Sequence, residues 1–305
     1  GMYYIQDSRN IFLNPAYVVN NANLVIFEWG SAGQYAMADS TSTTKTSATT
    51  INNNTSAPKA QGGFFQKYGE YTYGLYLGNE SNTSSLIRAA SSSAISAMNG
   101  YAGATTDVSS KMLQSADNQI DLFLAGGGSD LKWGTNLLYA SGKDETRSGK
   151  DTSIAIRGGL AASNWDAHLN LSLASKAEAT DASVTALGLG TQTNVRAEAK
   201  GKIGIQVGGS YVAPFGVRVF GYVKHYGWEQ TDSATYGITS YGGQNGTVKG
   251  DFTSIYLGWG RDFDVNNGDK IFTSLTAKKT DINLKYSNKS EVRHLVIPVV
   301  LGYEA

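Results

Sequence analysis

The chain has 305 residues, and its 25 acidic and 25 basic side chains give a formal net charge of zero. This balance argues against nucleic acid as a partner, because proteins that bind nucleic acid usually carry a basic excess. The absence of cysteine excludes disulfides, thiolate nucleophiles and cysteine metal sites.

Residues 1–20 form the first segment, and they do not alternate between polar and apolar positions. Ile11, Phe12 and Leu13 supply apolar anchors, and Asn14-Pro15-Ala16 is a turn signal because proline fixes its own φ and restricts the residue before it. We expect an irregular segment that docks onto a larger body. The alternative is a disordered terminus, since untethered termini are commonly poorly ordered.

From residue 21 onward the chain shows period-two alternation, which predicts β-strands with two distinct faces. Twelve strands are expected. In chain order they are 23–34, 60–67, 71–78, four strands beginning near 118, 131, 154 and 165, then 194–211, 217–228, 251–261, 270–280 and 292–303.

The stretch 194–211 has the clearest alternation. One set of residues, from Val195 to Tyr211, is apolar, and the other, from Arg196 to Ser210, is charged, polar or glycine. We predict one continuous strand longer than about 40 Å at ~3.3 Å per residue. Long amphipathic strands are what a membrane-spanning β-barrel needs.

The connections between the predicted strands alternate in length. Those after the even-numbered strands are short, such as GGGS at 126–129, whereas most others are long and polar. Short turns at one end and long loops at the other are typical of outer-membrane barrels. One long loop, 80–117, has an Ala- and Ser-rich middle that predicts a short helix.

The predicted fold is therefore all-β, an antiparallel transmembrane up-and-down β-barrel of about 12–14 strands. Residues 1–20 form an N-terminal periplasmic plug, and residues 21–305 form the barrel. The chain ends GYEA rather than on an aromatic residue. Either the barrel closes at twelve strands, or a C-terminal hairpin is missing and the intact barrel has about fourteen, which we favour.

The opening DSRNIFLNPA at 7–16 resembles outer-membrane barrels of the long-chain fatty-acid transporter type. In that family an Asn-Pro-Ala lies in a hatch that closes the barrel from the periplasmic side, and Asn14, Pro15 and Ala16 match it. The start is also similar to the major outer-membrane proteins of predatory Gram-negative bacteria. Near the end, Ile297-Pro298-Val299 to Gly302-Tyr303-Glu304 resembles a penultimate strand of such barrels.

Charged residues on the polar strand faces are candidates for the lining of a pore. Charges enclosed in a barrel must be paired or solvated, so they either neutralise one another or set a solute preference. In the N-terminal segment, Asp7, Arg9 and Asn14 are expected to latch the plug onto the inner wall. The predicted pore-lining residues are Lys132, Arg157, Asp166, His168, Arg196, Glu198, Lys200, Lys202, Arg218 and Lys224.

The tryptophans are predicted near strand ends, as in the interfacial aromatic girdles of membrane barrels. Ordinary sheet packing is the alternative, since aromatic residues favour strands anywhere. The set is Trp29, Trp133, Trp165, Trp228 and Trp259.

Catalysis has little support in the sequence. His168, His225 and His294 lie on separate predicted strands without ligand spacing, so neither a metal nor another cofactor is expected. The leading expectation is a non-enzymatic, porin-like channel of the bacterial outer membrane for small solutes, in contact with membrane lipid and lipopolysaccharide. The alternatives are a structural or surface protein with a filled lumen, a transporter of apolar molecules such as fatty acids, and a soluble β-sandwich. A homo-oligomer or another surface protein is a possible partner.

Overall fold

The structure, a computed structural model, describes residues 8–32, 58–79, 118–144, 149–186, 190–236, 246–264, 270–285 and 289–304. The helix predicted within 80–117 lies outside the described residues, as does Asp7. Three short 3-10 helices are described: η1 (Ser8–Phe12), η2 (Pro15–Asn21) and η4 (Pro214–Gly216).

All other described elements are strands. In chain order they are β1 (Leu24–Ala32), β2 (Pro58–Tyr68), β3 (Tyr71–Leu77), β4 (Asn118–Gly127), β5 (Leu131–Asp144), β6 (Gly149–Ala162), β7 (Trp165–Ala186), β8 (Gly190–Gly201), β9 (Gly204–Val212), β10 (Arg218–Tyr236), β11 (Gly246–Asp264), β12 (Lys270–Lys285), β13 (Lys289–Val296) and β14 (Val299–Glu304).

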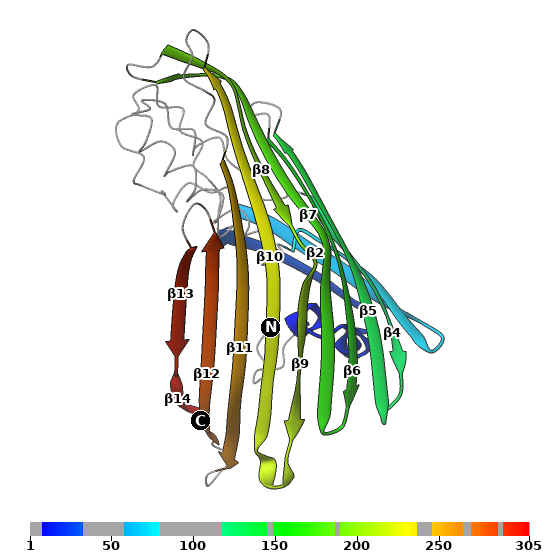
Figure 1. Cartoon of the computed structure of the whole chain (residues 1–305). Coiled ribbons are helices and arrows are strands. Elements are labelled where there is room, and N and C mark those ends of the chain that lie inside the picture. Colours follow the sequence, from blue (N-terminus) through cyan, green and yellow to red (C-terminus); the bar gives the residue numbers. More distant parts are fainter. Residues whose placement is uncertain are drawn as a thin grey trace.

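The strands form one fourteen-stranded sheet in which most strands pair with their neighbours in the sequence. The exceptions are β8 and β9, which both lie between β7 and β10, and β13 and β14, which both pair with β12. Every described pairing is antiparallel. The prediction of an antiparallel all-β fold is therefore confirmed. The described pairings leave β1 at one edge of the sheet and β13 and β14 at the other. Figure 1 shows the sheet curving around the N-terminal helices, drawn in blue.

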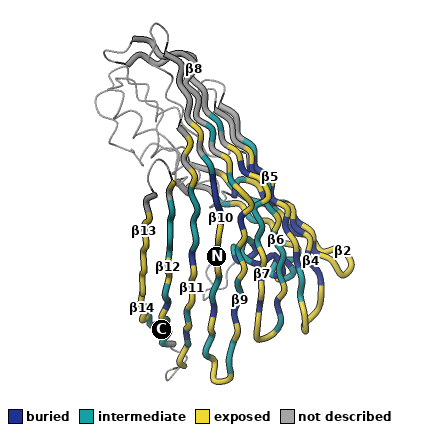
Figure 2. Tube along the Cα trace, viewed as in Figure 1, coloured by how far each residue is buried: buried dark blue, intermediate teal, exposed yellow. Residues whose placement is uncertain are grey.

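Burial alternates along the strands, as a period of two requires. In β4, Asp121, Phe123 and Ala125 are buried, whereas Leu122 and Leu124 are 49% and 42% exposed. The contrast recurs on other strands, whereas residues 291–296 of β13 are all exposed (Figure 2). One face, here called the inner face, carries the N-terminal segment and most of the buried polar groups, and the opposite, outer face exposes large apolar side chains.

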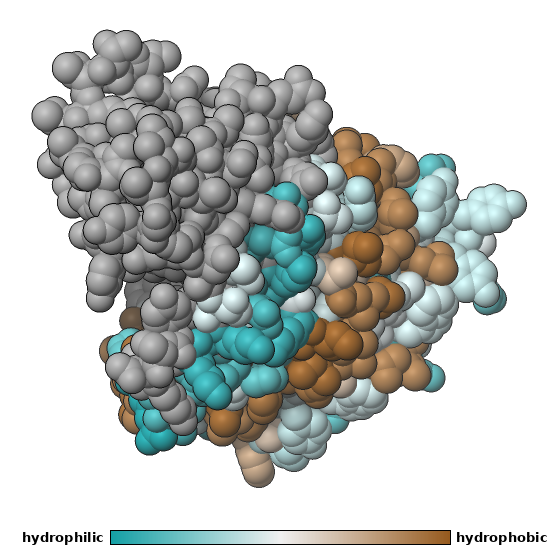
Figure 3. All heavy atoms as spheres, turned by 45° about the horizontal axis from the view of Figure 1, so that its top comes forward, coloured by the Kyte–Doolittle hydropathy of each residue, from teal (hydrophilic) through white to brown (hydrophobic). Residues whose placement is uncertain are grey.

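The exposed apolar side chains of the outer face come from nearly every strand. Figure 3 shows hydrophobic residues gathered in a broad patch beside a hydrophilic area. A soluble monomer rarely exposes so much contiguous apolar surface, and patches of this kind mark sites of interaction with proteins, ligands or membranes. Representative members are Phe27, Tyr73, Leu124, Leu137, Leu160, Leu169, Val207, Val223, Leu257 and Leu275.

Aromatic rings lie over glycines at directly paired positions, which helps to fix the strand register. Phe220 pairs with Gly258, and a Cβ at Gly258 would overlap the Phe220 ring. Trp228 covers its partner Gly250 in the same way. Trp228 is only 4% exposed and shares the inner face with Phe220, so it does not join the predicted girdle.

The predicted continuous strand 194–211 is interrupted, which is a correction to the sequence analysis. β8 ends at Gly201 and β9 begins at Gly204, although both pair with β7 and β10. Lys202 and Ile203, the two intervening residues, are both exposed. The pairing of β6 with β7 shifts its register between Ile154 and Ala155 of β6. β7 therefore has a bulge opposite these two residues, at the level of the break between β8 and β9. A bulge residue bends the strand and shifts its alternation by one.

The last predicted strand is also divided, into β13 and β14, at Pro298. Both parts keep one register on β12, with Lys278 opposite Val296 and Leu275 opposite Val299. Thr276 N donates a hydrogen bond to Pro298 O at 3.1 Å, so the proline carbonyl still takes part in the pairing with β12. It has no N–H to donate, and this accounts for the break.

Candidate functional site: the inner face and the N-terminal segment

Asn14 organises the turn between η1 and η2. Its side-chain oxygen accepts a hydrogen bond from Ala16 N at 3.0 Å and so caps η2, while Pro15 occupies the first turn, where its missing N–H costs nothing. The Asn14 amide nitrogen donates to Leu160 O at 3.0 Å and to Ala167 O at 3.2 Å. One buried side chain therefore shapes the segment and fastens it to β6 and β7.

Two inward-facing glycines make room for this turn. A Cβ at Gly159 would overlap the side chain of Asn14, and a Cβ at Gly134 would overlap the carbonyl of Pro15. The backbone of the Asn-Pro-Ala turn therefore approaches the sheet more closely than any other residue type at these two positions would permit.

Apolar packing holds the rest of the segment. Ile11 and Val18 are fully buried in a cluster with Phe65, Tyr76 and Phe123 of the sheet. The Phe12 ring meets the rings of Tyr76 and Phe123 edge to face, with centroids 4.9 and 5.8 Å apart. Edge-to-face pairs add to the burial energy. The predicted docking of residues around Ile11, Phe12 and Leu13 is observed for the described part of the segment.

Arg9 joins the segment to β1 through Glu28. Arg9 Nη1 lies 2.5 Å from Glu28 Oε2, and Arg9 Nη2 donates to Asn79 Oδ1 at 3.4 Å. The same Glu28 oxygen also accepts from Tyr76 Oη and Gln61 Nε2. The sequence pattern did not predict a role for Glu28. The available signal was an acidic residue among apolar neighbours on its predicted strand.

Asp166 forms a second anchor, at the other end of the segment. It accepts hydrogen bonds from Tyr17 Oη at 3.0 Å and from Ser210 Oγ, which in turn accepts from Arg218 Nη1 at 3.3 Å. Burial, followed by the charge of Asp166, raises the pKa of Tyr17 well above 10. Two predicted pore-lining residues, Asp166 and Arg218, thus lie in one network that holds the segment.

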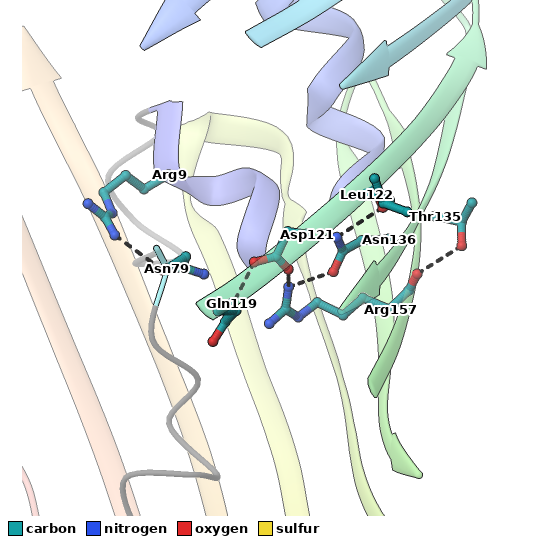
Figure 4. Close-up of polar contacts among 8 residues, drawn as sticks. All are labelled: Arg9, Asn79, Gln119, Asp121, Leu122, Thr135, Asn136 and Arg157. Atoms are coloured by element: carbon teal, nitrogen blue, oxygen red, sulfur yellow. Dashed lines mark hydrogen bonds and ion pairs between the residues drawn. The ribbon is translucent and has the colours of Figure 1, made fainter. Parts of the chain in front are cut away.

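A third network crosses the inner face of β4, β5 and β6 (Figure 4). Arg157 Nη1 lies 2.8 Å from Asp121 Oδ1 and 2.6 Å from Asn136 Oδ1. Gln119 Nε2 donates to the other oxygen of Asp121 at 2.9 Å. The Asp121 side chain is fully buried and that of Arg157 is 11% exposed. Arg157 therefore lies on the predicted face but is paired rather than free to meet a solute.

Three more predicted pore-lining residues lie on the inner face. Lys132 Nζ donates to Asn20 Oδ1 of the segment at 2.7 Å. His168 is 4% exposed and faces Gln206, with the two Nε2 atoms 3.4 Å apart. Lys224 is half-buried, and its Nζ lies 5.4 Å from the centre of the Tyr226 ring. Within the described residues, the N-terminal segment contacts Lys132, whereas Lys224 lies against Tyr226 of its own strand.

The interruption after β8 places the other charged residues differently. Lys200 pairs with Glu229 of β10, and Glu198 pairs with Thr231. Glu229 and Thr231 lie at odd-numbered positions of β10 and so face away from the inward-facing Trp228. Lys202 lies beside Gly227 on that same outer side. Glu198, Lys200 and Lys202 therefore occupy the outer face, because the bulge shifted the alternation on which the prediction rested.

These charged residues of the outer face form a cluster, here called the rim. It lies beyond the exposed apolar side chains of that face, here called the apolar belt. Lys176 Nζ lies 3.2 Å from both Glu178 and Glu198, and Lys200 Nζ lies 2.5 Å from Glu198. Hydrogen bonding to Lys200 lowers the pKa of Glu198 to about 2. The side chain of Arg196 lies outside the described residues, so its face is not assigned.

The chain was compared with protein-family models, curated proteins and solved structures, and no match was found. In the described part of the chain, no helix has the length and apolar character needed to cross a membrane. The same residues contain no group of three or more histidine, cysteine, aspartate or glutamate side chains placed to hold a metal ion.

Proposed function

We propose that the chain is an integral β-barrel of the bacterial outer membrane and that it forms a plugged, porin-like channel for small solutes. The observation that carries this proposal is the apolar outer face combined with a polar, hydrogen-bonded inner face. In lipid this inside-out pattern satisfies both faces, whereas in water the outer face would drive aggregation.

The height of the apolar belt supports a membrane location. On β7 the exposed apolar side chains run from Trp165 to Leu173, and above them Lys176 begins the charged rim. This span of eight residue steps measures roughly 26 Å along the strand at ~3.3 Å per residue. The nine residues of this span lie at the lower end of the roughly 9–11 residues with which a tilted strand crosses a bilayer.

Aromatic residues at the short-turn end add to this support. Tyr68, Tyr71, Trp165 and Tyr211 are exposed beside the β2–β3, β6–β7 and β9–β10 turns. Rings with polar tips favour the headgroup level of a bilayer. In this arrangement the long connections face outward, where the rim of Lys176, Lys200 and Lys249 would meet lipopolysaccharide.

In this proposal, residues 1–20 act as the plug, and the two edges of the described sheet, β1 on one side and β13 with β14 on the other, come together to close the barrel. The plug is tied to one wall by the Asn14, Arg9–Glu28 and Tyr17–Asp166 contacts. It packs chiefly on β3 to β6, which leaves the inner face of β10 to β12 for a solute path.

Conductance in planar bilayers tests the proposal. Purified protein inserted from detergent is expected to give discrete channel steps, and the steps should grow when residues 1–20 are deleted. Stable insertion without steps in either form would instead favour a structural protein with a filled lumen. Extraction and monodispersity without detergent would overturn the membrane location altogether.

A further inference from the structure

The inner face of β10, β11 and β12 combines stacked aromatic rings with lysines in the half of the sheet that the N-terminal segment leaves uncovered. Tyr222 stacks on Tyr256 with ring centroids 5.2 Å apart, and Tyr226 stacks on Phe252 at 5.0 Å. These four rings occupy two rows of directly paired positions, Tyr222 opposite Tyr256 and Tyr226 opposite Phe252.

Two lysines lie between and beside these rows. Lys224 separates Tyr222 from Tyr226 along β10, and Lys278 of β12 pairs directly with Tyr256. Lys224 lies opposite Ser254 of β11, and Lys278 lies opposite Tyr256, two residues further along the same inner face of β11. Lys278 is exposed and Lys224 is half-buried, so both can reach a solute on this face.

At the neighbouring positions that the structure describes, no carboxylate balances these charges. Among the described inward-facing positions from Phe220 to Tyr226, and those paired with them on β11 and β12, the charged residues are the two lysines. Asp166 lies across β9 and accepts hydrogen bonds from Tyr17 and Ser210. The wall therefore carries a local positive charge in a setting of low polarity, which attracts anions strongly.

We propose that this wall is the solute track of the channel and that it favours small organic anions that carry a planar ring. The ammonium groups of Lys224 and Lys278 hold the anionic group, and the faces of Tyr222 and Tyr256 hold the ring. This inference rests on the proposed channel function and adds the chemical class of solute.

The test uses the full chain in two assays. One outcome can then disprove the channel function without disproving the solute track, and the reverse. In planar bilayers, the reversal potential in a KCl gradient is expected to show chloride preferred over potassium. Lys224→Gln with Lys278→Gln should reduce that preference at least about threefold, since focused charge sets local ion concentration. Lys176→Gln with Lys249→Gln removes the same charge from the outer rim and should leave the preference unchanged.

The second assay measures benzoate binding to the protein in detergent by saturation-transfer NMR. Wild type should bind benzoate, and the Lys224→Gln, Lys278→Gln protein should not. Tyr222→Leu should weaken benzoate binding while the chloride preference is retained. Benzoate binding without conductance would remove the channel function and keep the site. Conductance without a preference for anions would overturn the proposed solute track. The same holds if the rim variant reduced the anion preference as much as the Lys224→Gln, Lys278→Gln variant does.

Discussion

Gly159 faces Asn14 so closely that a Cβ at position 159 would overlap the Asn14 side-chain oxygen. That oxygen is the acceptor that caps η2, so the missing side chain of one residue and the hydrogen bond of another determine how near the N-terminal segment lies to β6. The relationship can be tested because a second glycine lies next to the first.

Gly159→Ala is expected to loosen the N-terminal segment, because the new methyl group displaces Asn14 from its contacts with Leu160 and Ala167. Overpacking of this kind costs about 1–3 kcal/mol. Because the chain has no cysteine, Ser8→Cys offers a single site for a spin label, whose mobility should increase. Gly158→Ala is the matched control, since a Cβ there meets nothing within 4 Å. Equal mobility in both variants would contradict the role of Gly159.

The docking of the segment should weaken in alkaline solution. Burial and Asp166 raise the pKa of Tyr17 above its ordinary value of 10.0, so the docked state favours the protonated phenol. The stabilisation is therefore complete below pH 10 and is lost as the pH rises toward the pKa of the docked state. The spin label at position 8 should report this release, and Tyr17→Phe should remove that part of the pH dependence. Persistence of the full transition in Tyr17→Phe would assign it to another group.

Removal of one partner from the Asp121–Arg157 pair is expected to be strongly destabilising, because the other charge is then buried alone. Such losses are typically about 3–5 kcal/mol. Asp121→Leu alone should therefore lower the free energy of unfolding in vesicles more than Asp121→Leu combined with Arg157→Met. Urea titration followed by tryptophan fluorescence measures both. If the double variant were less stable than the single one, the pair would not be the main source of the loss.

The orientation of the sheet in the membrane predicts where an added charge is tolerated. Val207 is 50% exposed and lies in the middle of the apolar belt, paired with Leu169 and Val223. Val207→Arg should cost about 2–4 kcal/mol of stability in vesicles, as arginine does at the bilayer midplane. Thr231→Arg, exposed on the same face at the level of the rim, should cost much less. Equal costs at the two positions would argue against a lipid-facing belt.

The alternation in the sequence determined most of the fold. It predicted the antiparallel all-β class, the apolar and polar faces of strands such as β4 and β5, and the short turn near 126–129 between them. It did so because side-chain period and turn chemistry are local properties that a single strand already contains. The turn at Asn14-Pro15-Ala16 was predictable for the same reason.

Only the tertiary structure decided which charges face inward and which partners they find. The break at Lys202–Ile203 moves Glu198 and Lys200 to the outer face. The sequence of 194–211 contains no signal for this break, because the matching bulge lies on β7. Likewise, Glu28 becomes a hub only when Arg9, Gln61 and Tyr76 meet there. Register and long-range contact depend on neighbouring strands, so a reading along one strand cannot supply them.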